Sequence, residues 1–112
     1  MSNDMIHIVL FKFDLEKLAA EFPGDDLQNT VRNLEKVVPG LFSITLTPRP
    51  SQQNGNALND GGYNYILVSK HLDADALKVY IDHSYHKALL VRIKKCYLAP
   101  PMCVNINISA KL

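Results

Sequence analysis

Apolar residues recur along the chain with two different periods, and the shorter period predicts four β-strands. Residues 41–47 and 102–108 alternate apolar and polar side chains, as expected of strands with one buried face. Residues 5–13 and 63–70 are apolar on both faces, which is typical of central strands covered on two sides. In residues 41–47 we expect the dry face to carry Phe42, Ile44 and Leu46.

A period near 3.6 predicts helices between these strands. A short helical turn at residues 14–22 is followed by Pro-Gly and by a helix at 25–38, with Asp25 and Gln28 in the positions of a capping box. Asp73 is expected to cap a second main helix, with a break or bend near residues 82–84. The last helix is predicted over residues 85–98, with a Pro-Pro pair at 100–101 ending it.

The order strand, helix, strand, strand, helix, strand predicts an α+β, ferredoxin-like βαββαβ fold. Its four-stranded antiparallel sheet, in the order fourth, first, third, second, would carry the helices on one face only. We therefore expect a single domain over residues 1–112, with its core at about 5–108. The central strands would still leave apolar side chains exposed on the other face, so the pattern also predicts a homodimer paired through the sheet faces.

Composition narrows the class of protein. The 112 residues are 47% hydrophobic and 21% charged, with a net charge of +1, which gives no electrostatic reason to expect nucleic acid or a membrane as partner. The chain has no apolar run long enough for a span and no leader-like N-terminus, so we expect a cytoplasmic, reducing setting. Cys96 and Cys103 are then predicted to be buried thiols.

The candidate chemistry gathers in residues 80–86, Tyr-Ile-Asp-His-Ser-Tyr-His. Helical spacing would place Tyr80, His83 and His86 on one face. His7, on the first strand, is either a hydrogen-bonded core histidine or a pocket residue. His71 is expected to be exposed and idle, and residues 49–62 to form a connecting loop or a lid.

Four stretches together resemble the stress-responsive dimeric α/β-barrel domain family. They are His-Ile-Val-Leu-Phe-Lys-Phe at 7–13, Val-Pro-Gly-Leu at 38–41, Gly-Tyr at 62–63, and the 80–86 block. The family has ferredoxin-like protomers that dimerise through their sheets into a barrel, and it includes a plant polyketide cyclase. The resemblance spans residues 5–108 and implies the same dimeric α/β barrel here.

The resemblance also implies roles for individual residues. The cyclase's catalytic tyrosine and histidine match Tyr80 and His86, and a pocket histidine on its first strand matches His7. The candidate substrate-binding residues are His83, Tyr63, Tyr65 and Phe11. The chain departs from the family in two places: Ser84 stands where proline is usual, and an extra segment at 15–23 could narrow or roof the cleft.

Three hypotheses of function stay open at this stage. The first is a cofactor-free, lyase-type aldol cyclase that acts on a small aromatic or polyketide substrate. In it His86 is the base, Tyr80 either orients His86 or donates a proton, and His7 helps to place the substrate. The second is a non-catalytic dimer that either binds a small apolar ligand or serves only in the stress response. The third is a cofactor-free oxygenase of a polyphenol. No nucleotide, flavin or haem motif appears, and His83 and His86 lack companions for a metal site.

Overall fold

The computed structural model describes residues 4–49 and 62–108. Most of the predicted loop at 49–62 therefore lies outside the described residues. The elements in chain order are β1 (Met5–Phe13), α1 (Leu15–Glu21), α2 (Asp26–Val37), β2 (Leu41–Pro48), β3 (Tyr65–His71), α3 (Ala74–Asp82), α4 (Ser84–Lys94) and β4 (Tyr97–Asn107).

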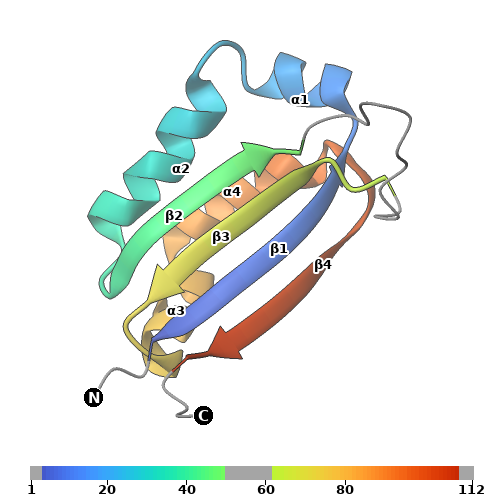
Figure 1. Cartoon of the computed structure of the whole chain (residues 1–112). Helices are drawn as coiled ribbons and strands as arrows, with labels where there is room; N and C mark the ends of the chain where they lie inside the picture. The colour runs from blue at the N-terminus through green and yellow to red at the C-terminus, as the bar shows by residue number, and fades with distance from the viewer. Residues whose placement is uncertain (1–3, 50–61, 109–112) are drawn as a thin grey trace.

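The four strands form one antiparallel sheet in the order β2-β3-β1-β4, which confirms the predicted topology. Figure 1 shows α3 and α4 behind this sheet, α2 alongside β2, and α1 at the end where β1 leaves the sheet. The molecule therefore has two layers, and the helices cover one face. None of the helices in the described ranges is long and apolar enough to cross a membrane.

The hydrophobic core lies between these two layers, because alternate side chains of each strand point toward the helices. Odd-numbered residues of β1, including Val9, Phe11 and Phe13, are buried beneath the helices. The apolar stripe of α2 packs on them, because Leu27, Val31 and Leu34 recur at spacings of three and four. Leu77 from α3 and Leu89 and Ile93 from α4 complete this layer.

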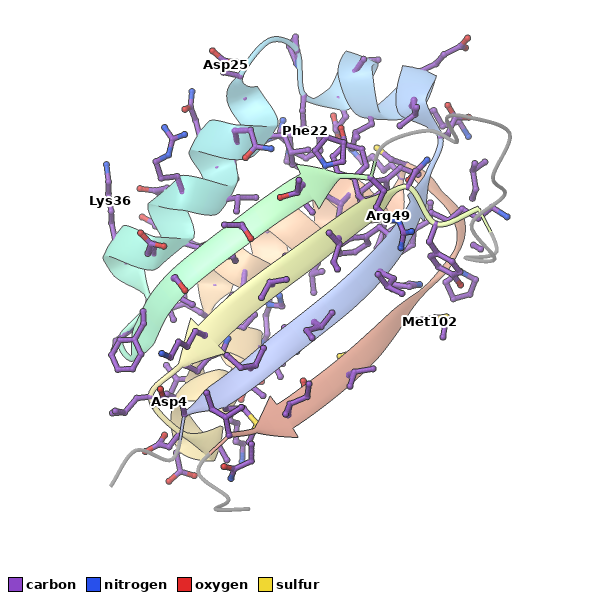
Figure 2. The ribbon with its side chains drawn as sticks, in the orientation of Figure 1. Asp4, Phe22, Asp25, Lys36, Arg49 and Met102 are labelled. Carbon is purple, nitrogen blue, oxygen red and sulfur yellow. The ribbon has the colours of Figure 1, made fainter. Side chains whose placement is uncertain are left out.

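The opposite face of the sheet is apolar, and no element in residues 4–49 and 62–108 covers it. Even-numbered residues of β1 pair across it with residues of both neighbouring strands: Ile8 lies opposite Val68 on β3 and Val104 on β4. Val104 is 54% exposed and Met102, labelled on β4 in Figure 2, is 53% exposed. We call this surface the open face; it comprises Ile6, Ile8, Leu10, Ile66, Val68, Met102, Val104 and Ile106.

The last helix and the last strand differ from their predicted bounds. Helix α4 ends at Lys94, and β4 begins at Tyr97 and runs through Pro100 and Pro101. Proline has no N–H to donate, but an edge strand pairs on one side only and can accommodate it. The Pro-Pro pair therefore lies inside the strand and does not end the helix.

Two local predictions in and around α2 and β2 were also wrong. The Asp25 side chain makes no capping hydrogen bond, and the Gln28 amide donates instead to the Leu46 carbonyl at 2.8 Å. Phe42 is 51% exposed, because the pairing of β2 with β3 is irregular between Leu41 and Ser43 and shifts the alternation. Leu41, Ile44 and Leu46 are the buried residues of that strand.

The predicted break within the 80–86 block is present. Helix α3 ends at Asp82 and α4 starts at Ser84, with His83 in an extended conformation between them. Ser84 in place of the family's proline thus leaves the break intact, and His86 falls on the first turn of α4, above the Tyr80 ring.

Candidate functional site

His7, Tyr80 and His86 line one pocket between the sheet and helices α3 and α4. Its volume is about 200 Å³, and Phe11 and Cys103 also contribute to its wall. We call it the His–Tyr pocket. The structure thus brings together the three residues predicted to be catalytic. The remaining lining side chains are Val9, Leu67, Ile81, Leu89, Leu90, Ile93, Tyr97 and Pro101.

Tyr80 is the most deeply buried residue of the site, with 1% of its surface exposed. Its ring centroid lies 4.3 Å from that of His86 and 5.9 Å from that of His7. Burial raises the pKa of the Tyr80 hydroxyl, and a charge on Cys103 would raise it further, so the group stays protonated. This hydroxyl has no hydrogen-bond partner in the described part of the chain, which leaves it available to a ligand in the pocket.

His86 is oriented by the end of the preceding helix. Its Nδ1 lies 3.0 Å from the carbonyl oxygen of Ile81, to which it can donate only when Nδ1 carries the proton. Nε2 is then the unprotonated nitrogen. Burial lowers the pKa of His86, while the hydrogen bond to Ile81 opposes that shift. His86 is therefore a neutral imidazole at pH 7 and has the protonation state that a general base needs.

His7 is both a hydrogen-bonded residue of the core and a residue of the pocket wall, so the two readings of the sequence are compatible. It is 8% exposed, and its Nδ1 lies 2.7 Å from Oδ1 of Asn105 on the neighbouring strand. The Sγ atom of Cys103 is 3.6 Å from the same nitrogen. Because Oδ1 can only accept, this geometry favours a proton on Nδ1 of His7.

The two cysteines differ in their surroundings. Cys96 is fully buried, as predicted, with 0% of its surface exposed. Cys103 is exposed, which contradicts the prediction. It lies on β4, the edge strand of the described sheet, and its side chain points to the helix side of the sheet and into the His–Tyr pocket.

His71 was wrongly predicted to be exposed and idle, since none of its surface is accessible. Its Nε2 lies 2.8 Å from the hydroxyl oxygen of Ser69, and its ring centroid is 4.9 Å from that of Tyr80. Burial, with smaller contributions from His7 and His86, lowers the pKa of His71 to about 4. The alternation of side chains along β3 could have predicted this burial, because His71 lies on the same face of the strand as Leu67 and Ser69.

Two residues predicted to bind substrate lie away from the pocket. His83 separates the two helices, and its Nδ1 accepts a hydrogen bond from the backbone N–H of Tyr85 at 3.1 Å. The hydroxyl of Tyr63 donates to the Pro100 carbonyl at 3.3 Å. No cluster of three or more His, Cys, Asp or Glu side chains that could hold a metal ion occurs in residues 4–49 and 62–108.

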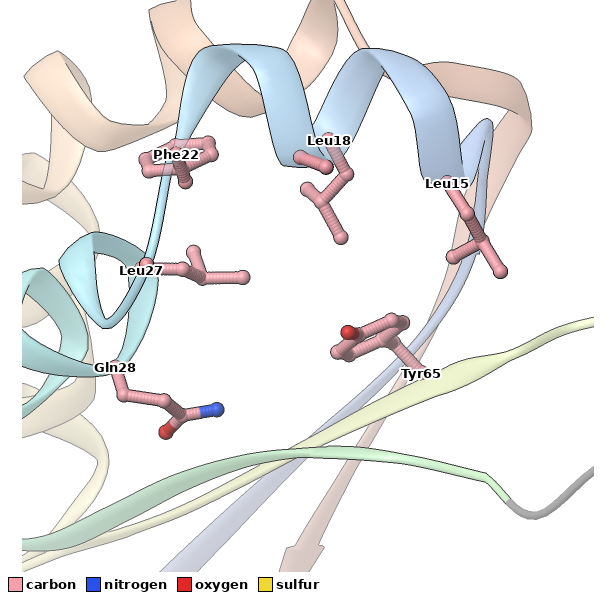
Figure 3. A pocket seen from close by; sticks show the side chains of 8 residues that line it. Leu15, Leu18, Phe22, Leu27, Gln28 and Tyr65 are labelled. Carbon is pink, nitrogen blue, oxygen red and sulfur yellow. The ribbon is translucent and has the colours of Figure 1, made fainter.

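Tyr65 lines a different hollow, shown in Figure 3. Its ring, from β3, faces Leu18 of α1 and Leu27 of α2 across a space of about 350 Å³. The extra segment therefore encloses a hollow of its own and does not roof the His–Tyr pocket. The buried ring of Phe13 contacts both Tyr65 and Tyr97, which line the two spaces, so it lies between them.

Comparison with solved structures supports the fold. A dimeric protein of unknown function with a ferredoxin-like fold from Bacteroides fragilis has a TM-score of 0.72 and 21% identity, covering 95% of this chain and 97% of that one. A candidate antibiotic biosynthesis monooxygenase from Caulobacter crescentus has a TM-score of 0.73 and 17% identity, covering 97% and 92%. A mutant cofactor-independent oxygenase from Streptomyces nogalater has a TM-score of 0.67 and 10% identity, covering 99% and 98%.

No curated protein matches the chain. The sequence profile of the stress-responsive A/B barrel domain matches residues 5–107, nearly the whole length. Together with the ferredoxin-like topology, this match shows that the chain belongs to the stress-responsive A/B barrel domain family.

Proposed function

We propose that this protein is a cofactor-free acid–base enzyme that forms and uses an enolate in the His–Tyr pocket. The observation that carries the proposal is the pairing of two groups in one mostly apolar space. Nδ1 of His86 faces the Ile81 carbonyl, and Tyr80, a buried residue of the pocket wall, has no hydrogen-bond partner for its hydroxyl in the described residues. One group can accept a proton and the other can stabilise the negative charge that results.

The reaction starts with removal of a proton from carbon next to a substrate carbonyl. The Nε2 atom of His86 takes the proton, and the electron pair moves onto the carbonyl oxygen. The Tyr80 hydroxyl donates a hydrogen bond to that oxygen in a site of low dielectric, where such a bond is strong. In an aldol closure the enolate carbon then attacks a second carbonyl of the same molecule. The proton held by His86 passes to the new alkoxide, while His7 helps position the substrate.

The pocket also limits the substrate. Its volume of about 200 Å³ is somewhat larger than the ~150 Å³ of a cavity that takes up benzene, so it suits a single-ring molecule with a short substituent. None of the described residues that line it is Lys, Arg, Asp or Glu. A charged substrate group would be desolvated there without a counter-ion, which is unfavourable. A neutral aromatic ketone or a short polyketide fits these limits.

The direct test follows the exchange of a carbon-bound proton and needs no knowledge of the natural substrate. Phenylacetone in D₂O is incubated with the protein, and deuterium uptake beside its carbonyl is followed by mass spectrometry. The wild-type protein should accelerate uptake, His86→Ala should abolish the acceleration, and His83→Ala should retain it. Binding of phenylacetone without faster exchange would refute the acid–base proposal and favour a non-catalytic ligand-binding protein.

We further propose that the chain works as a homodimer joined through the open face. This face presents Ile8, Val68 and Val104 in one cross-strand row, with further apolar residues on each side. Apolar area of this kind favours association by about 25 cal/mol per Å² removed from water. A second copy is the occupant that also matches the dimeric descriptions of several structural neighbours.

A second candidate function is oxygenation without a cofactor. Two neighbours are described as a candidate monooxygenase and a cofactor-independent oxygenase, and their likeness to this chain is one of fold. The same base could deprotonate a polyphenol, whose carbanion would react with O₂. Oxygen consumption with a polyphenol, absent in His86→Ala, would favour this reaction over aldol closure.

A further inference from the structure

Cys103 lines the His–Tyr pocket, although the acid–base reaction proposed above does not use its thiol. It is exposed, it forms part of the pocket wall, and its Sγ lies 3.6 Å from Nδ1 of His7. This nitrogen carries the proton that it shares with Asn105, so it can also donate weakly to a thiolate at Sγ. The sulfur is therefore reachable from the pocket and faces a hydrogen-bond donor.

A second group in the same pocket points to a carbonyl ligand. Tyr80 is 1% exposed, lines the pocket and has no hydrogen-bond partner for its hydroxyl in the described residues. A hydroxyl on the pocket wall can donate a hydrogen bond to an acceptor that enters the pocket, and a carbonyl oxygen is such an acceptor. The thiol and the donor are close enough that a charge on Cys103 affects the ionisation of Tyr80.

We propose that the His–Tyr pocket captures small α,β-unsaturated carbonyl compounds covalently at Cys103. Such molecules carry an electrophilic carbon and a carbonyl oxygen in one conjugated unit, which matches a thiol and a hydroxyl donor on one wall. The apolar side chains of Phe11, Leu67 and Ile93 would hold the hydrocarbon part. This activity is separate from enolate formation and does not depend on His86.

The step is a redox-neutral addition. The thiol releases its proton to solvent, and the thiolate forms an S–C bond with the β-carbon while the C=C π bond breaks. The electron pair moves to the carbonyl oxygen, where Tyr80 donates its hydrogen bond. Solvent returns a proton to the α-carbon, which restores the carbonyl. The product contains all atoms of the thiol and of the ligand, and no oxidant or reductant is needed.

Burial raises the pKa of the Cys103 thiol, so little thiolate is present at pH 7. The thiol is therefore not generally reactive, and selectivity for enones must come from recognition of the carbonyl by Tyr80. This distinguishes pocket capture from ordinary alkylation of an exposed cysteine: loss of the tyrosine hydroxyl should slow enone addition and leave alkylation by other reagents unchanged.

The test compares two reagents on the intact chain. Cyclohex-2-en-1-one supplies the conjugated carbonyl, and iodoacetamide, which alkylates thiols by displacement, is the control reagent. Adducts at Cys103 are followed by mass spectrometry over time, and Cys103→Ser shows that the signal belongs to this thiol. We expect one adduct per chain and a rate that saturates with enone concentration. Tyr80→Phe should lower the enone rate about tenfold or more, with the iodoacetamide rate within about twofold.

A second measurement avoids mutation and covers the case in which Tyr80→Phe disturbs folding. Cyclohexanone has the same shape and carbonyl but cannot form the adduct, so it should compete and slow enone addition. Two results together would overturn the proposal. The first is a rate that rises linearly with enone concentration and is not slowed by cyclohexanone. The second is a ratio of the enone rate to the iodoacetamide rate equal to the ratio measured for glutathione. The readout is mass and not turnover, so it is independent of whether His86 forms enolates.

Discussion

The hydroxyl of Ser69 and Nε2 of His71 lie 2.8 Å apart on β3, and neither residue has any surface accessible to water. The other ring nitrogen of His71, Nδ1, is buried without a partner in the described part of the chain. The two groups share one hydrogen bond, in which either the Ser69 hydroxyl or Nε2–H can donate, depending on the tautomer of His71. Each of these two buried groups therefore depends on the other for its hydrogen bond.

The first prediction concerns this pair. Ser69→Ala should lower the free energy of unfolding by about 1–3 kcal/mol, because it leaves both nitrogens of His71 unpaired in the core. The double variant Ser69→Ala/His71→Leu should recover most of that loss, since it removes both partners of the bond. Urea denaturation of the two single variants and the double variant gives the coupling energy directly. Additive losses would show that the contact contributes nothing.

Stability should also fall as the pH drops from 6.5 to 4. The pKa of His71 is lowered from 6.5 to about 4 in the folded chain, so in this window the unfolded state binds more protons. The contribution of His71 is fully present above pH 6.5 and decreases by roughly 3 kcal/mol on reaching pH 4. The lowered pKa of His86 acts in the same direction.

The measurement is urea denaturation of wild type and His71→Phe at pH 7.5, 5.5 and 4.5. The variant lacks the titrating group, so its stability should depend less steeply on pH within this range. Equal slopes for the two proteins would mean that His71 does not titrate as its burial implies.

The sequence predicted the frame of the fold well and the site less completely, for physical reasons. Periodicity located β1, the α2 stripe and the strand order, since each rests on many residues. The burial of His71 was not predicted, because a single residue at the end of a strand adds little to the alternation of apolar and polar side chains. Phe42 was assigned to the wrong face of β2, because the irregular pairing of β2 with β3 shifts the alternation of its side chains. Such an irregularity depends on the neighbouring strand and cannot be seen in the sequence of β2 alone. The break at His83 was predicted, yet helical spacing had placed that residue with Tyr80, and the break removes it.

Gly40 is expected to tolerate no side chain. Its φ is +78°, and an added Cβ would lie 2.7 Å from the Cβ of Ala76 on α3. Gly40→Ala should therefore combine the strain of left-handed backbone, about 1–2 kcal/mol, with a steric clash in the core. Gly24→Ala is the matched control, because Gly24 has φ +61° but nothing within 4 Å of the new Cβ. If both variants lose the same stability, the contact with Ala76 has no effect.

The homodimer proposal predicts different outcomes for two matched substitutions. Val104→Lys introduces a charge on the open face, whereas Val91→Lys places the same charge on α4, where Val91 is 63% exposed. Burying an unpaired ammonium between two sheets is unfavourable, so Val104→Lys should yield monomers. Val91→Lys should leave the dimer unchanged. Light scattering at micromolar concentration measures both; a monomeric wild-type protein would contradict the proposed assembly.

The protonation of His86 can be checked without any substrate, and the chain provides its own control. Nδ1 of His86 faces a carbonyl oxygen and must donate, whereas Nδ1 of His83 faces a backbone N–H and must accept. The two neutral rings should therefore be opposite tautomers, with the proton on Nδ1 in His86 and on Nε2 in His83. Two-bond ¹H–¹⁵N correlation spectra at pH 8 distinguish these forms. Protonation of His86 at Nε2 would remove its lone pair from the pocket and with it the proposed base.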